Sequence, residues 1–464
     1  MLTTAALPDE VICLTEQTLV SLEDIAIPEN VFFTLLSKTK MCVGTNVSIF
    51  RNIRKNVSIF RNIRNDEDFL GVDEATRNKP FRLERDGETA TALALENIRS
   101  IPPESISCTL FFLSLSKTFL INIFPKLRIS EDRGLEKLVL DADKEEQVSA
   151  ILAQEQPTHI RRVNEMVFKG YAVNALTKII TNEDSEVKTL TLSADKKEQV
   201  AAILAQEETF CVGRVKEMIF HYYAVNVLVK IITNEDTDVE HLVLYAVKEE
   251  QVTAILAQEK TFCVGGRRVK NMSLGSYAVN VLARIEISED GEVENLLVRA
   301  QEEEHVAAIL AQEKTFCVGS GRVKNISLGS YAVNVLTRIE ISEDGEVESL
   351  TLKAYKKEHV AAILTREQTF CVGSGRVKNI SLGSYAVNVL ARIEISEDCL
   401  LEMFIMHANE EQSFKLLEAE DRSIEVGRIR IRGFKVPEEI KRKLRYTLVD
   451  GKGNEVEENQ ERER

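Results

Sequence analysis

The sequence contains no tryptophan, and only 8 prolines and 21 glycines among its 464 residues. These few turn-forming residues are not gathered into a Pro-, Gly- or Ser-rich stretch, so we expect no flexible linker inside the main body of the chain. Hydrophobic residues make up 44% of the sequence. A chain of this length and composition can bury a large core, and separate globules would number about three.

Signals for export and membrane insertion are also missing. The N-terminal "MLTTAALPDE" has no basic region ahead of an apolar run, so we expect no signal peptide and a cytoplasmic or nuclear protein. The stretch from Ile106 to Phe124 is apolar enough to be tested as a membrane span. However, it contains Lys117, and its "SLSKTFLIN" matches the internal phrase "SLGSYAVN". We therefore interpret it as a buried repeat unit and expect no membrane partner.

The chain has fewer positive than negative charges, and its cysteines form no metal-binding motif. The net charge of -15 repels phosphate backbones, so nucleic acid is not an expected partner. No CxxC pair is present to suggest zinc. Four cysteines recur in a repeated "TFCVG" phrase: Cys211, Cys263, Cys317 and Cys371. If these phrases stack two strands apart, the cysteines lie about 10 Å apart, too far for a disulfide. They are interpreted as buried free thiols in a reducing compartment.

The motifs of common enzymes are absent as well. We find no phosphate-binding loop, no HExxH and no GxSxG, and "GSGRVK" from Gly319 lacks the spacing of a phosphate loop. The 6 histidines are dispersed. His305 and His359 occupy a helix position where other copies carry glutamine, which indicates surface variation. The sequence therefore predicts no enzyme, no cofactor and no metal site.

The sequence does contain an internal repeat. "VKNISLGSYAVNVL" begins at Val323 and again at Val377, 54 residues later, and the variant "VKNMSLGSYAVNVL" begins at Val269. Each period holds two phrases with an apolar-x-x-apolar-x-apolar pattern, too short for a helix and rich in β-branched residues, which predicts strands. The first, named A, begins at Leu135, Val187, Val239, Val293, Val347 and Leu401. The second, named B, begins at Val163, Val215, Val269, Val323, Val377 and Val426.

Helical phrases separate these strands. "KKEHVAAILTRE" follows an A strand, and "SYAVNVLARIEI" follows a B strand, with Val387, Leu390 and Ile393 three residues apart. The spacing is 28 or 30 residues from A to B through most of the chain, and 24 from B to A. One strand and one helix per unit, repeated, predict a solenoid. A doubly wound sheet or a closed barrel is the alternative, but so many near-identical units fit an eight-stranded barrel poorly.

The strand phrase, the unit length and the strand-helix alternation resemble leucine-rich repeats, in particular the alternating two-unit repeats of ribonuclease-inhibitor-like proteins. The resemblance implies an α/β horseshoe with parallel strands on the concave face and helices on the convex face. The family usually places Asn or Cys three residues after the strand phrase, whereas the B units carry Tyr there. Asparagines three residues further on are expected to satisfy backbone groups at the turn: Asn174, Asn226, Asn280, Asn334 and Asn388.

We expect three regions along the chain. Residues 1–106 are degenerate N-terminal repeats and a cap, with an irregular duplicated segment at 46–65. Residues 107–434 form the regular solenoid, and residues 435–464 form a C-terminal cap helix, a turn and an acidic tail. The basic segment 428–445 is interpreted as part of this cap, with docking of an acidic partner or RNA as the alternative.

The predicted partner site lies on the strand face. The second strand position alternates Glu and Lys from Glu240 to Glu402, which suggests a stabilising charge ladder. The third position is small and polar, which leaves a groove that a partner can approach. The candidate partner-binding residues are Tyr245, Asn271, Asn295, Arg299, Asn325, Ser349, Lys353, Asn379 and His407.

The sequence thus predicts a non-enzymatic intracellular scaffold that binds a protein ligand on the concave strand face. An alternative comes from "LPDEVICL" at Leu7, which resembles the opening of an F-box, the helical module that recruits ubiquitin-ligase adaptors. That resemblance implies a substrate receptor. The other interpretation of the N-terminal segment is a further repeat unit or cap, with "SLEDIAI" as its strand.

Overall fold

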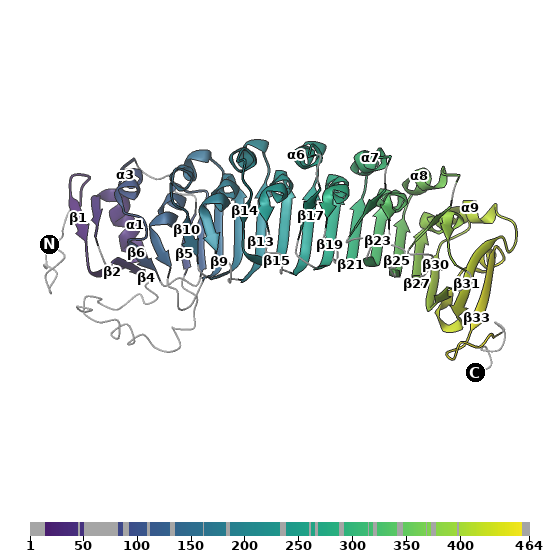
Figure 1. Ribbon diagram of the computed structural model, residues 1–464. Helices are drawn as coiled ribbons and strands as arrows, with labels where there is room; N and C mark the ends of the chain where they lie inside the picture. Colours follow the sequence, from purple (N-terminus) through teal and green to yellow (C-terminus); the bar gives the residue numbers. More distant parts are fainter. Residues whose placement is uncertain are drawn as a thin grey trace. The chain divides into compact units, whose positions relative to one another are not determined.

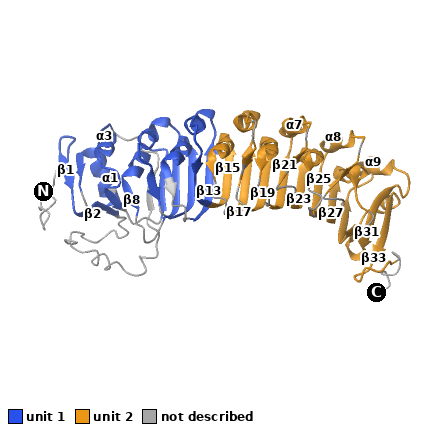
Figure 2. Ribbon diagram, viewed as in Figure 1, with its two compact units in different colours: residues 1–214 blue, residues 215–464 orange. Residues whose placement is uncertain are grey.

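A computed structural model describes residues 14–456, except 45–46, 51–81, 87–91, 109–111, 130–134, 161, 182–185, 233–237, 259–260, 265–267, 287–291, 314, 319–322, 341–346, 368, 373–376 and 397–398. The chain forms two compact units, residues 1–214 and residues 215–464 (Figure 2). Each unit is built on a parallel sheet whose strands alternate with short helices (Figure 1). The predicted α/β repeat organisation is therefore confirmed.

The sheet of unit 1 follows the A and B phrases in sequence order. Its strands are β5 (Arg82–Asp86), β7 (Phe112–Ser116), β9 (Leu135–Ala142), β11 (Val163–Gly170) and β13 (Glu186–Ala194), each parallel to the next. In β9, Leu135, Leu138 and Leu140 are at most 2% exposed. The first, fourth and sixth phrase positions thus point into the core, as the apolar pattern predicts.

The N-terminal part of unit 1 adds further parallel strands and two helices. These elements are β1 (Leu19–Leu22), β2 (Ile25–Pro28), α1 (Glu29–Lys38), β3 (Lys40–Val43), β4 (Val47–Phe50), α3 (Ala92–Ser100), β6 (Ile106–Cys108) and β8 (Leu127–Ile129). The buried Asn97 of α3 accepts a hydrogen bond from Met41 N at 2.9 Å and donates to the carbonyls of Leu36 and Thr39. "SLEDIAI" spans two strands, because Asp24 turns the chain with φ 46° between β1 and β2.

Unit 2 repeats the same plan over a longer stretch. Its sheet contains β15 (Arg214–Tyr222), β17 (Val239–Ala246), β19 (Arg268–Ser276), β21 (Glu292–Ala300), β23 (Val323–Ser330), β25 (Val347–Ala354), β27 (Val377–Ser384), β30 (Met403–His407) and β32 (Phe434–Lys435). Neighbours in this order are parallel. The sheet therefore alternates A and B strands from β15 to β30.

The segments that follow the B strands are 3-10 helices. They are η4 (Tyr171–Lys178), η6 (Tyr223–Lys230), η8 (Tyr277–Arg284), η10 (Tyr331–Thr337) and η13 (Tyr385–Arg392), and η2 (Phe119–Lys126) follows β7 in the same way. Val387 and Leu390 are buried on η13. Their spacing of three matches the three residues per turn of a 3-10 helix, so the predicted helix exists in its tighter form.

The segments that follow the A strands are short turns of 3-10 and α-helix. They comprise η3 (Glu145–Gln147) with α4 (Ser149–Leu152), η5 (Lys197–Val200) with α5 (Ala201–Leu204), η7 (Glu249–Gln251) with α6 (Thr253–Leu256), α7 (Glu304–Leu310), η11 (Lys357–Val360) with α8 (Ala361–Leu364), and η14 (Glu411–Ser413) with α9 (Phe414–Leu417). Both predicted helical phrases of the repeat are thus confirmed.

The B-unit asparagines hold each 3-10 helix to the helix of the following A unit. Asn334 Oδ1 accepts from Ile363 N at 3.0 Å, and its Nδ2 donates to His359 O at 3.0 Å. The same acceptor contact links Asn174 to Ile203, Asn226 to Ile255, Asn280 to Ile309 and Asn388 to Leu416. These amides satisfy backbone groups that a helix end leaves without partners. Their predicted role at the turn is confirmed.

A second set of short strands lies outside the main sheet of each unit and forms two-stranded parallel sheets. β18 (Phe262–Cys263) pairs with β20 (Ile285–Glu286), β22 (Phe316–Cys317) with β24 (Ile339–Glu340), β26 (Phe370–Cys371) with β28 (Ile393–Glu394), and β10 (Thr158–Ile160) with β12 (Ile179–Thr181). The remaining short strands are β14 (Phe210–Cys211) and β16 (Ile231–Ile232).

Two of the repeated cysteines are exposed, so the prediction of buried thiols is wrong for Cys211 and Cys371. The following valines, Val212 and Val372, are at most 4% exposed. Since successive side chains of an extended segment alternate in direction, burying the larger valine turns the cysteine outward. Partial desolvation of its sulfur, the charge of Glu394 and a hydrogen bond to that carboxylate raise the pKa of the Cys371 thiol.

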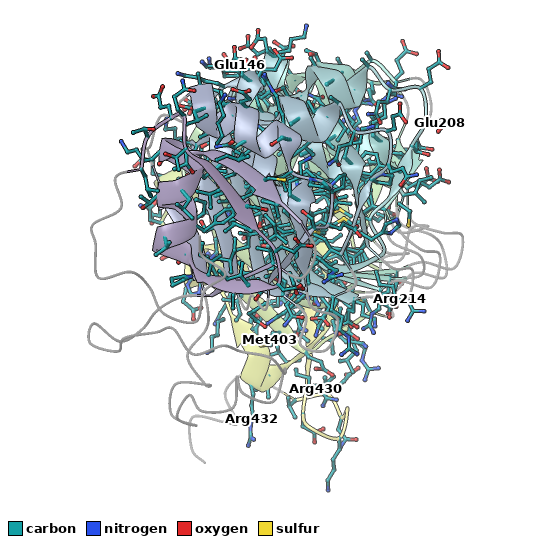
Figure 3. All side chains as sticks on the ribbon, turned by 90° about the vertical axis from the view of Figure 1, so that its left-hand side faces the viewer. Glu146, Glu208, Arg214, Met403, Arg430 and Arg432 are labelled. Atoms are coloured by element: carbon teal, nitrogen blue, oxygen red, sulfur yellow. The ribbon has the colours of Figure 1, made fainter. Side chains whose placement is uncertain are left out.

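The C-terminal segment forms a separate small sheet in the order β29 (Leu400–Leu401), β31 (Ile424–Arg430) and β33 (Leu444–Val449), with η15 (Ile431–Gly433) and α10 (Glu438–Lys441) between its last two strands. The B phrase at Val426 is a strand, as predicted, but it belongs to this sheet, and β32 lies beside β30 instead. Figure 3 shows Met403, Arg430 and Arg432 at this end of unit 2.

Basic side chains of this segment contact the final turn. Arg428 Nη2 donates to Gly453 O at 2.8 Å, and Arg430 Nη1 donates to Gly451 O at 3.0 Å. Lys443 forms an ion pair with Asp421 at 2.8 Å. These contacts give several of the basic residues a structural role at the end of the chain.

Some expectations concern residues outside the described ranges. The F-box-like residues 7–13 lie there, as do the tail from residue 457 and all of the duplicated segment 46–65 except Val47–Phe50, which forms β4. The division at residues 106 and 434 remains a prediction. In the part of the chain that the structure describes, no helix has the length and apolarity needed to cross a membrane.

Candidate functional site

The candidate site is the outward side of the unit 2 sheet. Counted from the start of each A or B phrase, positions one, four and six are buried, whereas positions two, three, five and seven are not. Strand pairing places equal positions side by side, so Asn271, Asn295, Asn325, Ser349 and Asn379 occupy adjacent strands. We call these sets of equal positions row two, row three, row five and row seven.

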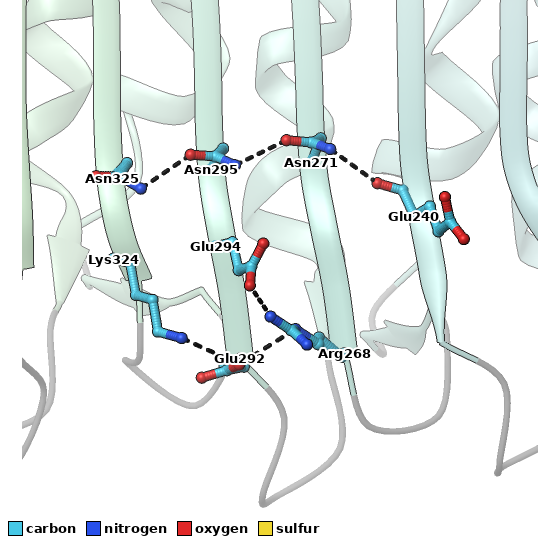
Figure 4. Close-up of polar contacts among 8 residues, drawn as sticks. All are labelled: Glu240, Arg268, Asn271, Glu292, Glu294, Asn295, Lys324 and Asn325. Carbon is cyan, nitrogen blue, oxygen red and sulfur yellow. Dashed lines mark hydrogen bonds and ion pairs between the residues drawn. The ribbon is translucent and has the colours of Figure 1, made fainter.

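Row three is a chain of amide hydrogen bonds across the strands (Figure 4). Asn325 Nδ2 donates to Asn295 Oδ1 at 2.9 Å, and Asn295 Nδ2 donates to Asn271 Oδ1 at 2.8 Å. Asn271 Nδ2 in turn donates to Glu240 O at 3.2 Å. All three asparagines are half-buried. The row is therefore an ordered, uncharged part of the surface.

Row three is interrupted once. Ser349 lies between Asn325 and Asn379 in the register. Asn379 Nδ2 donates to the Glu348 carbonyl at 3.2 Å, repeating the contact that Asn271 makes with Glu240. The predicted small polar row is thus present, and most of its amides are engaged with neighbouring strands.

Row two carries the predicted alternating charges, but some of its ion pairs involve residues that precede the strand phrases. Lys216 lies 3.9 Å from Glu240, and Lys378 lies 3.6 Å from Glu348, as the alternation predicts. Elsewhere Arg268, one residue before the B phrase, pairs with both Glu292 and Glu294, and Lys324 reaches Glu292 at 3.4 Å (Figure 4). Such partly exposed pairs each stabilise by a few tenths to about 1 kcal/mol.

Row seven alternates long side chains with glycines. In strand order from β17 to β30 it is Tyr245, Gly275, Arg299, Gly329, Lys353, Gly383 and His407. The four long side chains are exposed. A Cβ on Gly275 would lie 2.7 Å from Cδ2 of Tyr245, so the ring lies against this glycine.

An aromatic cluster occupies one end of row seven. The rings of His221, Tyr222 and Tyr245 meet edge to face, with centroids 6.1 to 6.5 Å apart. Tyr222 has φ 59°, a left-handed backbone conformation that is uncommon for a bulky residue. His221 and Tyr222 are not among the residues predicted from the sequence, because nothing local to the sequence shows that the two strands bring these rings together.

The interpretation of His305 and His359 as surface variants is wrong. They are 9% and 3% exposed, and their rings lie against Tyr277 and Tyr331 with centroids 4.7 and 4.6 Å apart. Burial lowers the pKa of both imidazoles, against the opposing influence of Glu302. The corresponding Gln251 is buried because its Oε1 accepts from Lys248 N, so this position belongs to the turn and not to the surface.

The ionisable groups of the C-terminal segment line an open hollow. Its lining includes Asp421, Arg422, Lys441 and Arg445. Lys443 lowers the pKa of Asp421 through a hydrogen bond and its charge. Within the described ranges, no group of three or more His, Cys, Asp or Glu side chains is arranged to hold a metal ion.

Comparisons of the chain with protein-family models, with curated proteins and with solved structures returned no match.

The structure places the nine predicted partner-binding residues on one side of one sheet: Asn271, Asn295, Asn325, Ser349 and Asn379 in row three, and Tyr245, Arg299, Lys353 and His407 in row seven. Along a strand, rows three and seven are about 13 Å apart.

Proposed function

We propose that the chain is a non-enzymatic protein-interaction scaffold inside the cell, and that a protein ligand binds the outward strand face of unit 2. The observation that carries this proposal is row seven, whose long side chains stand exposed beside glycines on a face whose other side chains are mostly neutral or paired with one another. Side chains at regular spacing on a stiff sheet form an extended contact surface.

The same proposal includes a leucine-rich-repeat-like horseshoe with this face on its concave side and the helices on its convex side. Support comes from the parallel sheet, the repeated strand-helix units and the buried asparagines that link them. Among the described residues, Cys42, Cys211, Cys371 and Cys399 form no disulfide, which suits a reducing compartment.

The test replaces Asn325 and Asn379 by arginine in the full chain. The longer, charged side chains would block the face and interrupt the amide row without removing any core residue. We expect a partner captured from cell extract by the unchanged protein to be lost, while the circular dichroism spectrum and the melting temperature stay close to those of the unchanged chain.

A matched control adds the same charge elsewhere. Ala307→Arg and Ala362→Arg lie at exposed positions of α7 and α8, and this double variant should retain the partner. Retention by the Asn325→Arg, Asn379→Arg variant as well would place the binding site elsewhere.

The F-box alternative is tested in the same experiment by deleting residues 1–13. This deletion spares α1 and β3, whose backbone groups bind Asn97. Recovery of a ubiquitin-ligase adaptor with the intact chain alone would favour a substrate receptor. Capture of one and the same non-ligase partner by both forms favours the scaffold.

A further inference from the structure

We propose that the ligand of this face is an acidic peptide in the polyproline II conformation. Every third residue of the peptide faces one A strand, and the residues that face Arg299 and Lys353 carry carboxylates. This inference rests on the proposed function and names the chemistry of its partner. It is carried by the spacing, the free charges and the glycine supports of row seven.

The cationic side chains of row seven are available for a ligand. The side chains of Arg299 and Lys353 form no hydrogen bond or ion pair with any residue in the described ranges, and both are exposed. By contrast, Lys324 and Lys378 of row two are paired with glutamates of neighbouring strands. The two cations of row seven are thus exposed and unpaired among the described residues, whereas of the row-two lysines on the same sheet only Lys270 is.

The stems of these cations lie over glycines of the next strand. A Cβ on Gly329 would lie 3.6 Å from Arg299 Cγ, and a Cβ on Gly383 would lie 3.4 Å from Lys353 Cγ. The aliphatic stem of each cation thus lies over the glycine of the next strand, while its charged head remains in solvent. A side chain that is partly ordered before binding loses less conformational entropy when the ligand arrives.

The spacing of row seven selects the conformation of the ligand. Tyr245, Arg299, Lys353 and His407 are separated by two strands at each step, which corresponds to about 10 Å. A polyproline II helix has three residues per turn and rises about 9.3 Å per turn, so every third side chain points to the same side. In a β-strand, residues three apart point to opposite sides.

The surroundings favour negative charge in the ligand. Rows three, five and seven contain no Asp or Glu from β17 to β30; row five consists of Val243, Ser273, Leu297, Ser327, Thr351, Ser381 and Ile405. The acidic groups of row two are largely paired. A basic row on a neutral face, within a chain of net charge -15, is complementary to carboxylates at short range.

Tyr245 completes the row at one end. The residue is 40% exposed, and its ring lies against those of His221 and Tyr222. Aromatic rings are the usual contact surface for proline in a polyproline II ligand. We therefore expect one ligand residue per turn to face the row. The ligand has an apolar residue at Tyr245, a carboxylate at Arg299, a carboxylate at Lys353 and a further hydrogen-bond acceptor at His407.

The test uses the full chain and a fluorescein-labelled peptide of four Glu-Pro-Pro repeats, with binding followed by fluorescence anisotropy. A second peptide has the same composition, but its glutamates alternate with prolines at every second position. We expect the first peptide to bind at least about fivefold more tightly than the second. We expect its affinity to fall at least about tenfold in the Arg299→Glu, Lys353→Glu variant, because two attractions become repulsions.

The matched control is the Lys270→Glu, Lys378→Glu variant, which makes the same change in net charge in row two of the same face. It should reduce affinity much less. Equal loss in both variants, equal binding of both peptides, or equal binding of a single-stranded RNA that is lost in the same variants would overturn the proposal, since each would mean that the face senses charge alone.

The experiment separates this inference from the function on which it rests. Suppose that the Asn325→Arg, Asn379→Arg variant loses its cellular partner while the acidic peptide does not bind and the Arg299→Glu, Lys353→Glu variant keeps that partner. The scaffold function then stands and the acidic-peptide inference is wrong. If none of these changes affects any ligand, both are wrong.

Discussion

Truncation of Asn334 to alanine should strongly weaken the contact between two neighbouring repeat units. Its side chain is 2% exposed and makes two hydrogen bonds of 3.0 Å, one from Ile363 N and one to His359 O. Truncation removes both bonds and leaves a buried donor and a buried acceptor without partners. At about 1–3 kcal/mol for each unsatisfied group, the free energy of unfolding should fall by roughly 2–6 kcal/mol.

The measurement is urea unfolding of the full chain, followed by circular dichroism. Because each unit contacts only its neighbours, loss of one contact should also broaden the transition or divide it in two. Amide hydrogen exchange adds a local measure, and the Ile363 amide should exchange much faster in the variant. The control is Asn325→Ala, which removes the same atoms from a half-buried surface row and should cost less than about 1 kcal/mol. Equal effects of the two substitutions, or an unchanged exchange rate at Ile363, would refute the reasoning.

Three further predictions concern positions in single repeats. Ser384 has φ 53° and ψ -130° at the end of β27, where β11 has glycine, so Ser384→Gly should raise the free energy of unfolding by roughly 1 kcal/mol in urea titrations; a loss of stability would contradict this. The pKa values of His305 and His359 are lowered from 6.5 by burial, so the unfolded chain binds more protons and stability should decline as the pH falls below 6.5. The His305→Gln, His359→Gln variant should lose that part of the difference between urea midpoints at pH 7.5 and 5.5, and an unchanged difference would count against buried neutral imidazoles. The raised pKa of Cys371 predicts slow alkylation by iodoacetamide at pH 8, faster in Glu394→Gln, and equal rates would exclude an influence of that carboxylate.

The regular part of the fold was predictable because its signals are local. An apolar-x-x-apolar-x-apolar phrase such as that at Val323 already specifies which side chains of a strand are buried. The spacing of three residues between Val387 and Leu390 likewise predicts the helix that follows the strand. The buried asparagines were predictable for a similar reason, since an amide repeated beside a turn, as at Asn334, can satisfy the backbone groups exposed there.

The errors occurred where partners far apart in the sequence decide the outcome. The phrase at Val426 has the strand pattern, but its pairing with β29 and β33 depends on residues outside the phrase. The exchange of His359 for glutamine in other copies suggests an exposed helix position, whereas this side chain is buried against Tyr331. The glycine that supports each row-seven side chain belongs to the next strand, so its role at Gly329 emerges only from the register.

The alternation of A and B units determines how many units such a chain can gain or lose at a time. The buried asparagine belongs to the B unit, and its backbone partners belong to the following A unit. Removing one unit alone would therefore leave either the amide or the helix end without its hydrogen-bond partner. Removing or adding a full period, such as the 54 residues that begin at Val323, keeps every such pair. Recombination between the near-identical copies would therefore shorten or lengthen row seven by one long side chain and about 10 Å at a time. If row seven binds a peptide as proposed, gene copies that differ by whole periods would select ligands of different length without any change to an individual contact.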